Sequence, residues 1–554
     1  MGHREAYTFS AWKWLGFVSA VWVQAIAGNN YTFSNYSDAI KTIMNLTQLQ
    51  LNNLSVAKDV GKAFGLISGL ASDRLPTSVI LLIGSIEGLV GYGIQWLVVS
   101  RKIQPLPYWQ MCIFMCMGGN SSTWMNTAVL VTCMRNFRRN RGPVSGILKG
   151  YVGLSTAIFT DLSTALFDKD PSKILVLLAV IPFAVCLTAV FFLREIRQSA
   201  PVATENEEDR YFTIFNEVAV VIAVYLLTYD LIGSTNQVVS LVFAIILLIL
   251  LASPLAVPVY SFIKSWRLVG FEPDMEQQEP LLEQEANTTT AEKREVTEEE
   301  QPVVAAGEAV TAVEKIRPVI GEEHTVVEMM QTWDFWLLFV SFLCGVGTGM
   351  AVINNMAQIG LALGHANVSI FVSFISIWGF FGRIISGSVS EYFLKRAGTP
   401  RHVWNAASQI LMAVGFFLMA LAMPGSLYIG SIVVGICYGV RLAVSVPIAS
   451  ELFGLKYFGL LYNILILNLP IGSFLFSGLL AGYLYDAQAI PTPGGGNTCV
   501  GAHCYRLVFI VMAIVSVIGF GLDVLLAIRT KNVYTKIFTS QKSKKSLTTS
   551  NGQR

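Results

Sequence analysis

Charged residues are scarce in this sequence. Asp, Glu, Lys and Arg make up only 13% of its 554 residues, whereas a soluble globular protein carries about 25%. The formal net charge is only +2, so the charge balance does not indicate binding to nucleic acid. Hydrophobic residues make up 53% of the chain. This composition is typical of a membrane protein.

The motifs of soluble enzymes and metalloproteins are also missing. The eight cysteines and five histidines are scattered along the chain, and no group of them has the spacing of zinc ligands. The sequence contains no phosphate-binding loop, no dinucleotide-binding fingerprint and no metal-binding histidine pair. We therefore expect no cofactor, no metal and no enzymatic activity. The same absences disfavour transport driven by ATP.

The apolar residues occur in runs of about 20, the length that crosses the core of a bilayer. Backbone groups in lipid must bond within their own segment, so each run is expected to be a helix. The runs form groups of six, two and six, which predicts an all-α polytopic membrane protein with 12–14 transmembrane helices. Two six-helix halves would flank two extra helices. The predicted spans lie at about 14–36, 54–72, 77–99, 108–133, 143–165, 173–193, 213–231, 237–263, 333–357, 367–390, 403–422, 426–448, 459–484 and 505–529.

Basic residues gather in alternate loops and near the C-terminus. Because Lys and Arg are enriched in cytoplasmic loops, this pattern predicts that both termini are cytoplasmic. The cytoplasmic ends would be a short N-terminal segment, 1–12, and a basic tail, 531–554. The basic clusters lie at 135–141, 194–197, 395–401 and 529–545.

Features expected on the exterior fall in the opposite loops. Asn45, Asn53 and Asn367 each begin an N-glycosylation triplet. Cys499 and Cys504 lie in the last of these loops, where a disulfide could persist. Alternatively, the triplets are unused and the cysteines are free. Glycosylation favours a membrane of the secretory pathway, and the plasma membrane, the vacuole and other endomembranes all remain open.

A polar stretch separates the two predicted halves, 13–265 and 331–530. Residues 266–330 are rich in Glu, Gln, Thr and Ala and nearly free of aromatic residues. Such a segment cannot bury enough apolar surface to fold alone. We therefore expect a disordered cytoplasmic linker.

A short motif occurs at equivalent places in the two halves. Gly69 and Asp73 end the second span, and Gly387 and Glu391 end the second span of the later six. Internal symmetry of this kind is common in transporters. The glycine lets another helix approach closely, and the acid can cap a helix N-terminus or pair with an arginine. We interpret these residues, together with Arg74, as a conformational latch.

The run Gly69–Arg74 resembles the loop motif of the major facilitator superfamily, which is glycine, three residues, Asp and Arg. The superfamily motif usually continues with a glycine and basic residues, whereas Leu75, Pro76 and Thr77 follow here. The latch is therefore weaker than usual, or residues 135–141 complete it.

Two further runs, Gly28–Ser34 and Lys58–Gly65, resemble the plant nodulin-like family. The second half of the chain resembles the C-terminal part of the nuclear-fusion-defective-like members of that family. Together these resemblances cover most of the chain outside the linker and tail. They imply a major facilitator fold that works by alternating access, near the bacterial oxalate–formate exchangers, and leave the cargo open.

Polar residues inside predicted spans are costly, which makes them functional candidates. By resemblance to the superfamily, the first helix of each half lines a central cavity. The alternative role is hydrogen bonding between helices, which amides do well. The candidates for substrate binding are Gln24, Asn29, Asn30 and Tyr31 in the first span, Asn126 beside Trp124 in the fourth, and Asn354, Asn355 and Gln358 in the ninth.

Two basic residues within spans suit an anionic cargo. Lys149 and Arg441 lie among glycines in the fifth and twelfth spans, and arginine binds a carboxylate or phosphate through two hydrogen bonds. The alternative for Arg441 is a structural ion pair with Glu451. Glu87 lies in the middle of the third span, where it could carry a proton or serve as a hydrogen-bonded structural acid.

A second charged group lies near the outer end of the second span. Lys58 and Lys62 are four residues apart, so they share one helix face. They could bind an anionic solute or pair with Asp161. Alternatively they extend to the membrane surface, with Asp59 between them.

These features predict a secondary active transporter of a small solute, with a small organic anion favoured and protons as the candidate coupling ion. A neutral metabolite or amino acid bound by the amides is a second option. The alternative from another class is a receptor or scaffold that signals through the linker and tail. Convergence of Glu87, Lys149 and Arg441 on an open cavity would favour transport, and their pairing within a filled centre would favour the scaffold.

Overall fold

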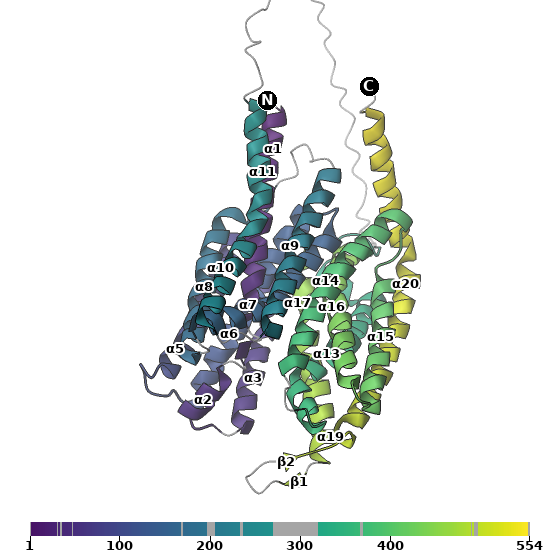
Figure 1. The fold of residues 1–554 in the computed structure, drawn as a ribbon. Coiled ribbons are helices and arrows are strands. Elements are labelled where there is room, and N and C mark those ends of the chain that lie inside the picture. The colour runs from purple at the N-terminus through teal and green to yellow at the C-terminus, as the bar shows by residue number, and fades with distance from the viewer. Residues whose placement is uncertain are drawn as a thin grey trace, which may run out of the picture.

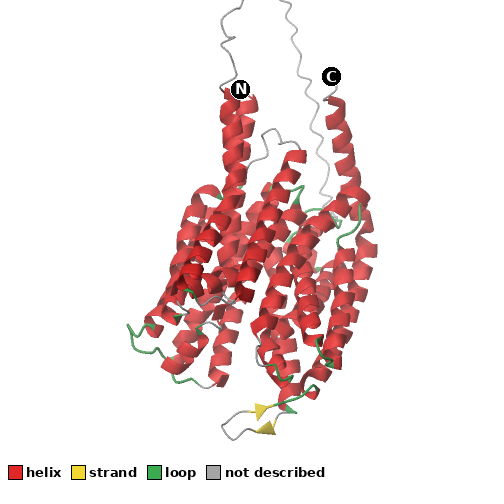
Figure 2. Ribbon diagram, in the orientation of Figure 1, coloured by secondary structure: helices red, strands yellow, loops and turns green. Residues whose placement is uncertain are grey.

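The computed structural model describes most of the chain as helix (Figure 2). The description that follows applies to residues 2–29, 32–33, 36–46, 48–167, 170–196, 205–232, 236–269, 319–365, 369–488, 490–491 and 497–551.

The N-terminal half contains eight helices among the described residues. They include α1 and a short α2 that follows it at one end of the bundle (Figure 1). The bounds are α1 Gly2–Ala27, α2 Ser37–Ile43, α3 Gln48–Ala63, α4 Gly65–Ser72, α5 Thr77–Val99, α6 Tyr108–Asn136, α7 Arg141–Phe167 and α8 Pro171–Phe192.

Two further hydrophobic segments precede the C-terminal half. The first is α9, Glu205–Ile232, and the second consists of α10, Gln237–Ala252, a 3-10 turn, η2 Ser253–Leu255, and α11, Ala256–Val269. The later helices are α12 Val326–Met330, α13 Trp333–Ala362, α14 Ser369–Ala397, α15 His402–Leu421, α16 Ser426–Phe453, α17 Phe458–Ile466, α18 Asn468–Gly472, the π-helix η3 Ser473–Gly482, α19 Tyr483–Asp486 and α20 His503–Asn551.

All fourteen predicted spans correspond to a helix or to consecutive helices. The second span is interrupted at Phe64, between α3 and α4, and the thirteenth divides into α17, α18, η3 and α19. Within the described residues, nine segments are long and apolar enough to cross a membrane. The remaining predicted spans, which are α1, α3–α4, α6, α7 and α14, are more polar. For example, α6 buries Ser121, Ser122, Thr123, Thr127 and Thr132.

The helices form two bundles that lie side by side (Figure 1). Both chain termini lie at one end, which we call the terminal end. The opposite end carries a small antiparallel hairpin of β1, Ile490–Pro491, and β2, Asn497–Thr498, and we call it the hairpin end. Predicted exterior and cytoplasmic loops therefore fall at opposite ends of the molecule.

The segment expected to be a disordered linker, 266–330, is ordered at both of its ends. Helix α11 continues to Val269, and α12 lies within residues 319–330. Thr325 and Glu328 form a capping box at the start of α12, which satisfies two backbone N–H groups of the first turn. Residues 270–318 lie outside the described part. The basic tail, 531–554, is helical as far as Asn551, because α20 continues as one helix to that residue.

Candidate functional site

The first copy of the glycine–acid motif joins the two halves at the terminal end. A Cβ atom on Gly69 would lie 2.7 Å from the carbonyl oxygen of Gly459, at the start of α17. Asp73 accepts hydrogen bonds from the backbone N–H groups of Leu460 and Gly459, and Arg135 donates to it at 3.3 Å. Burial raises the pKa of Asp73 to about 6, although Arg135 and the two N–H groups act to lower it. Both contacts expected for this acid, helix capping and an arginine, are present.

The second copy makes equivalent contacts. A Cβ atom on Gly387 of α14 would lie 2.6 Å from the carbonyl oxygen of Gly142, at the start of α7. Glu391 accepts from the N–H of Gly142 at 3.1 Å and from Arg401 at 2.6 Å. Arg401 also pairs with Glu451 at 2.9 Å. Since each motif of one half caps a helix of the other, the two copies together seal the terminal end of the interface.

The arginine of the first copy is Arg135 rather than Arg74. Arg74 follows the motif in sequence, but it lies exposed at the surface. Arg135, at the end of α6, also donates to the carbonyl oxygens of Leu455 and Lys456 in the other half, at 3.4 and 3.2 Å. Its second terminal nitrogen donates to Glu195 at 3.2 Å. The basic cluster 135–141 therefore supplies the positive charge that residues 75–77 lack.

Two cationic side chains from opposite halves meet in the interior of the interface. Lys149 of α7 donates a hydrogen bond to the hydroxyl of Tyr462 on α17 and lies 4.8 Å from the centre of that ring. Arg383 of α14 lies one turn further along, because a Cβ on Gly153 of α7 would meet its guanidinium. Lys149 is 7% exposed and Arg383 is 8% exposed. The two positive charges are close enough to repel each other electrostatically.

Arg383 was not among the residues selected from sequence. The signal that could have identified it is a single arginine inside an otherwise apolar run, Trp378–Ile385. In contrast, the structure places Arg441 in a different environment from the expected cargo contact. Arg441 is 1% exposed and donates to Asp523 and to Ser341, all within the C-terminal half. Glu451, the expected alternative partner of Arg441, pairs with Arg401 instead.

A polar group lies between the cationic pair and the terminal seal. Asn463 of α17 donates across the interface to Thr127 of α6 at 2.9 Å, and Ser68 of α4 lies 3.0 Å from the same hydroxyl. Asn126 donates to the carbonyl of Ser122 in its own helix at 2.8 Å. Asn463, which sequence analysis did not single out, is the amide that crosses the interface here.

The amides of α1 are the most deeply buried of the predicted polar residues. Gln24 and Asn29 are both 0% exposed. Among the described residues, neither side chain has a hydrogen-bond partner for its oxygen or its nitrogen. Buried polar atoms are nearly always bonded, so these two amides are exceptions in the sealed form. Asn30 and Tyr31 lie outside the described residues.

The predicted polar residues of α13 form hydrogen bonds to neighbouring helices. Asn354 donates to Ser473 at 2.9 Å and Asn355 donates to Ser477 at 2.8 Å, both on the π-helix η3. Gln358 accepts from Tyr505 of α20 at 3.1 Å. These contacts match the alternative of hydrogen bonding between helices. π-helices are frequent at functional sites, and η3 is the π-helical segment that α13 contacts.

The remaining membrane charges are partnered within the N-terminal half. Both oxygens of Glu87 accept from Asn120 of α6, at 2.9 and 3.1 Å, and Glu87 is half-buried. Asp59 lies 2.9 Å from Lys62 and 3.9 Å from Lys58. The ion pair lies inside α3 itself, with Asp59, whereas Asp161 was the partner considered from sequence.

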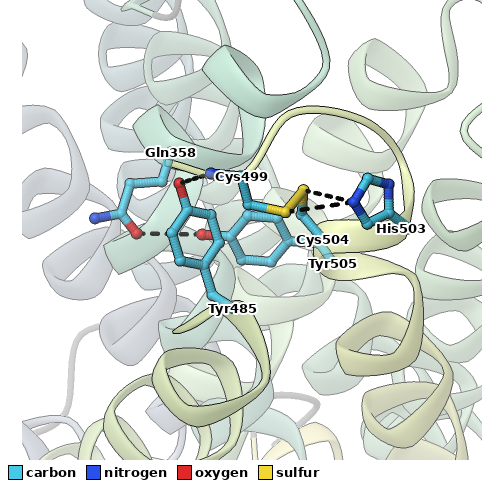
Figure 3. Close-up of a disulfide and its surroundings, with 6 residues drawn as sticks. All are labelled: Gln358, Tyr485, Cys499, His503, Cys504 and Tyr505. Atoms are coloured by element: carbon cyan, nitrogen blue, oxygen red, sulfur yellow. Dashed lines mark hydrogen bonds between the residues drawn. A yellow bond between two sulfur atoms is a disulfide. The ribbon is translucent and has the colours of Figure 1, made fainter. Parts of the chain in front are cut away.

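A disulfide joins Cys499 and Cys504 at the hairpin end (Figure 3). The hydroxyl of Tyr485 accepts from the N–H of Cys499 at 3.0 Å, and the imidazole of His503 lies 3.7 Å from the Cys499 sulfur. The N–H of Gly501 donates to the last residue of α13 at 2.8 Å. The bridge thus ties the start of α20 to α13 and α19.

The glycosylation triplets can be placed in part. Asn45, in the turn after α2, and Asn53, in the first half of α3, are both exposed, and these elements lie at the hairpin end (Figure 1). Asn367 lies outside the described residues.

Two helical bundles sealed at one end by repeated motifs, with polar groups held between them, define a membrane transporter of the major facilitator superfamily. A solved bacterial homologue of the iron transporter ferroportin, in its outward-facing state, matches 93% of this chain and 99% of its own, with a TM-score of 0.55 and 10% identity. A likeness at that identity establishes the fold alone. The predicted fold class is confirmed.

The chain belongs to the nodulin-like family. Residues 13–259 match that family and residues 318–536 match the NFD4 C-terminal domain. Protein NUCLEAR FUSION DEFECTIVE 4 of Arabidopsis thaliana is 32% identical over 98% of this chain and 92% of its own length. Probable transporter mch1 of Emericella nidulans is 21% identical over 86% of this chain and 80% of its own length. The predicted family is confirmed, and the relatives identify a transporter.

Proposed function

We propose that this protein is a secondary active transporter that carries a small organic anion by alternating access. The observation that supports the anion is the buried pair of cations, Lys149 and Arg383, at the interface of the two halves. Two positive charges held close together attract an anion electrostatically. A carboxylate between the two would offset their mutual repulsion, and the guanidinium can bind it through two hydrogen bonds.

The bound anion also provides a reason for the halves to move together. Lys149 and Tyr462 come from opposite halves, and so do Lys149 and Arg383. A ligand can shift a conformational equilibrium only through different affinities for the two states. An anion that touches both halves at once satisfies that condition, because its contacts change when the halves rock.

The proposed orientation places the terminal end in the cytoplasm. The basic clusters lie at that end, and the disulfide and two glycosylation triplets lie at the hairpin end. Since the terminal end is sealed, the conformation is one that faces outward. The host membrane would be the plasma membrane, the vacuole or another endomembrane.

Protons are the proposed coupling ion, with Glu87 as the carrier. Its carboxyl lies half-buried between α5 and α6, where Asn120 holds it. A carboxyl at membrane depth is a functional candidate by default. Proton binding there would remove a charge next to α6, the helix that also carries Thr127 of the polar group.

A receptor or scaffold built on the same fold is the second candidate. Arg441 is paired off within its half and Glu87 is hydrogen-bonded within its own, which was the pattern expected of a scaffold. The Lys149–Arg383 pair favours transport instead, because two buried positive charges from opposite halves suit an anion that binds between them.

Uptake by purified protein in proteoliposomes tests this proposal. Labelled mono- and dicarboxylates and amino acids would be offered with and without an inward proton gradient. We expect uptake of a carboxylate that falls at least about tenfold in Lys149→Gln and in Arg383→Gln, because each loses a charge-assisted hydrogen bond. Lys173→Gln, which removes an exposed charge at the hairpin end, is the matched control.

The same assay separates the coupling ion from the cargo. Glu87→Gln should abolish the effect of the proton gradient and leave exchange of the anion intact. Uptake that is unchanged in both Lys149→Gln and Arg383→Gln would reject the proposed anion site. Binding of a carboxylate without any uptake would support the receptor.

A further inference from the structure

Helix α9, the first of the two helices between the halves, is anchored on the N-terminal half. Three aromatic side chains of α9 pack against Trp14 of α1, with ring centres 5.1 to 5.7 Å apart. Aromatic contacts of this kind add to the stabilisation by burial. The helix also contacts both α7 and α14, and so covers the seam where the halves meet. The three side chains are Tyr211, Phe212 and Phe215.

Ionic contacts reinforce this anchor at the terminal end. Glu208 of α9 pairs with Lys13 of α1 at 2.6 Å. The same carboxylate accepts from Asn140, in the loop before α7, at 3.2 Å. Glu208 is only 6% exposed, so the start of α9 is held firmly to α1 and to the α6–α7 loop.

An adjacent face of α9 binds the other half. Lys395 of α14 donates to Asp209 at 3.1 Å and to Asn140 at 2.6 Å. Two turns along α9, Asn216 donates to Ser388 of α14 at 3.1 Å. Ser388 directly follows the motif glycine Gly387. The contacts of α9 therefore fall within the second copy of the glycine–acid motif, at Ser388, and one turn after it, at Lys395.

We propose that α9 is a clamp between the halves, which holds the terminal end sealed and sets how readily it opens. The inference rests on the alternating-access mechanism proposed above. To open the terminal end, α14 must part from α7, and α9 moves with α7 because of its aromatic and ionic anchor. The bonds of Lys395 to Asp209 and of Asn216 to Ser388 must then break. The extra helices are accordingly part of the gate, in addition to connecting the halves.

The ion pair between Asp209 and Lys395 should stabilise the sealed form measurably and still break when the terminal end opens. Asp209 has a half-exposed side chain and Lys395 a largely buried one, 50% and 22% exposed. A partly exposed ion pair shifts an equilibrium by about two- to five-fold. Loss of one such contact should therefore raise the population of the open form without unfolding the protein.

Distances between spin labels on the full-length protein in nanodiscs test the clamp. The labels would be attached through Arg138→Cys, before α7, and Ala397→Cys, at the end of α14, both exposed. Cys112 and Cys116, the partly exposed free cysteines, would be replaced by serine. We expect Asp209→Asn, and separately Asn216→Ala, to increase the long-distance population by about two- to five-fold.

The neighbouring residue Glu207 supplies a matched control. It pairs with Lys264 of α11 at 2.8 Å, so its ion pair does not cross to the other half. Glu207→Gln makes the same change of charge two residues away and should leave the distances unchanged. Asp209→Asn combined with Lys395→Gln should have less effect than the sum of the two changes, because they share one bond.

The outcomes distinguish the clamp from the transport mechanism. A reference variant, Gly387→Ala, opens the seal through steric contact. If it lengthens the distance and Asp209→Asn does not, the clamp is rejected and alternating access stands. An equal response to Glu207→Gln would also reject the clamp. A single short distance in every variant would overturn both proposals.

Discussion

At the scale of single residues, the buried arginines and lysines divide into two kinds. Arg401 and Arg441 are matched by carboxylates of their own half, Glu451 and Asp523. Removing one partner from such a pair leaves a buried charge and is strongly destabilising. Lys149, by contrast, is bonded to a neutral phenol of the opposite half. The first kind stabilises the C-terminal half, and the second lies at the interface where we propose that the anion binds.

The pH dependence of the seal should follow from Asp73. Its pKa is raised by burial from 3.8 to about 6 in the sealed form, and we expect the ordinary value once the seal opens to water. The sealed form then binds the proton more tightly. Its added stability is complete below 3.8 and is lost as the pH rises through about 6.

The spin-label pair at residues 138 and 397 measures this effect. Between pH 7.5 and 5 the long-distance population should fall, by at most about tenfold per pH unit. Asp73→Asn, which cannot ionise, should flatten the profile. A profile that is unchanged by Asp73→Asn would show that another group titrates.

At the scale of helices, the seal depends on how closely two pairs of helices approach. Helix α4 meets the start of α17 and α14 meets the start of α7, and in both pairs a glycine lies at the crossing. Small residues allow backbones to come this close. The same contact lets an acid reach the exposed N–H groups of the facing helix, where negative charge is favoured.

Gly387→Ala should weaken the seal. Its Cβ would lie 2.6 Å from a backbone oxygen of Gly142 and 2.9 Å from the Cα of Gly146, so the helices must separate. We expect an open population at least about fivefold larger by spin-label distance, since overpacking costs about 1–3 kcal/mol. Gly93→Ala is the control, because nothing lies within 4 Å of its Cβ position. Equal behaviour of the two variants would contradict this account of the seal.

At the scale of the whole molecule, the described end of the linker is connected to the seal. Glu323 accepts from the backbone N–H groups of Leu455 and Lys456, at 3.2 and 2.8 Å. The carbonyl groups of the same two residues accept from Arg135. The described C-terminal part of the polar segment between the halves thus contacts the same loop as Arg135.

The two ends of the molecule should face different compartments. Epitope tags added at the N- and C-termini should both bind antibody only after permeabilisation, because basic loops are retained in the cytoplasm. Asn45→Gln and Asn53→Gln should each remove a glycan, seen as faster migration on a gel. Tags accessible on intact cells would reverse the proposed orientation.

The apolar runs and the repeated motif were readable from the sequence because both are local. A run of about 20 apolar residues specifies a membrane helix regardless of its neighbours, and α5 begins and ends where it was predicted, at Thr77 and Val99. Gly69 and Asp73 lie near one helix end, which therefore carries a small residue for close packing and an acid that can cap another helix. Resemblance to a family then supplied the architecture, and the comparisons confirmed it.

The partners of the charged residues were decided only by tertiary structure. Arg441 and Arg383 are alike in sequence, since each is a single arginine in an apolar helix. Helix packing places Asp523 against the first and Lys149 near the second, although neither neighbour is close in the chain. The groups within a few ångströms set the environment of a buried charge, because Coulomb interactions decay with distance and not with sequence separation.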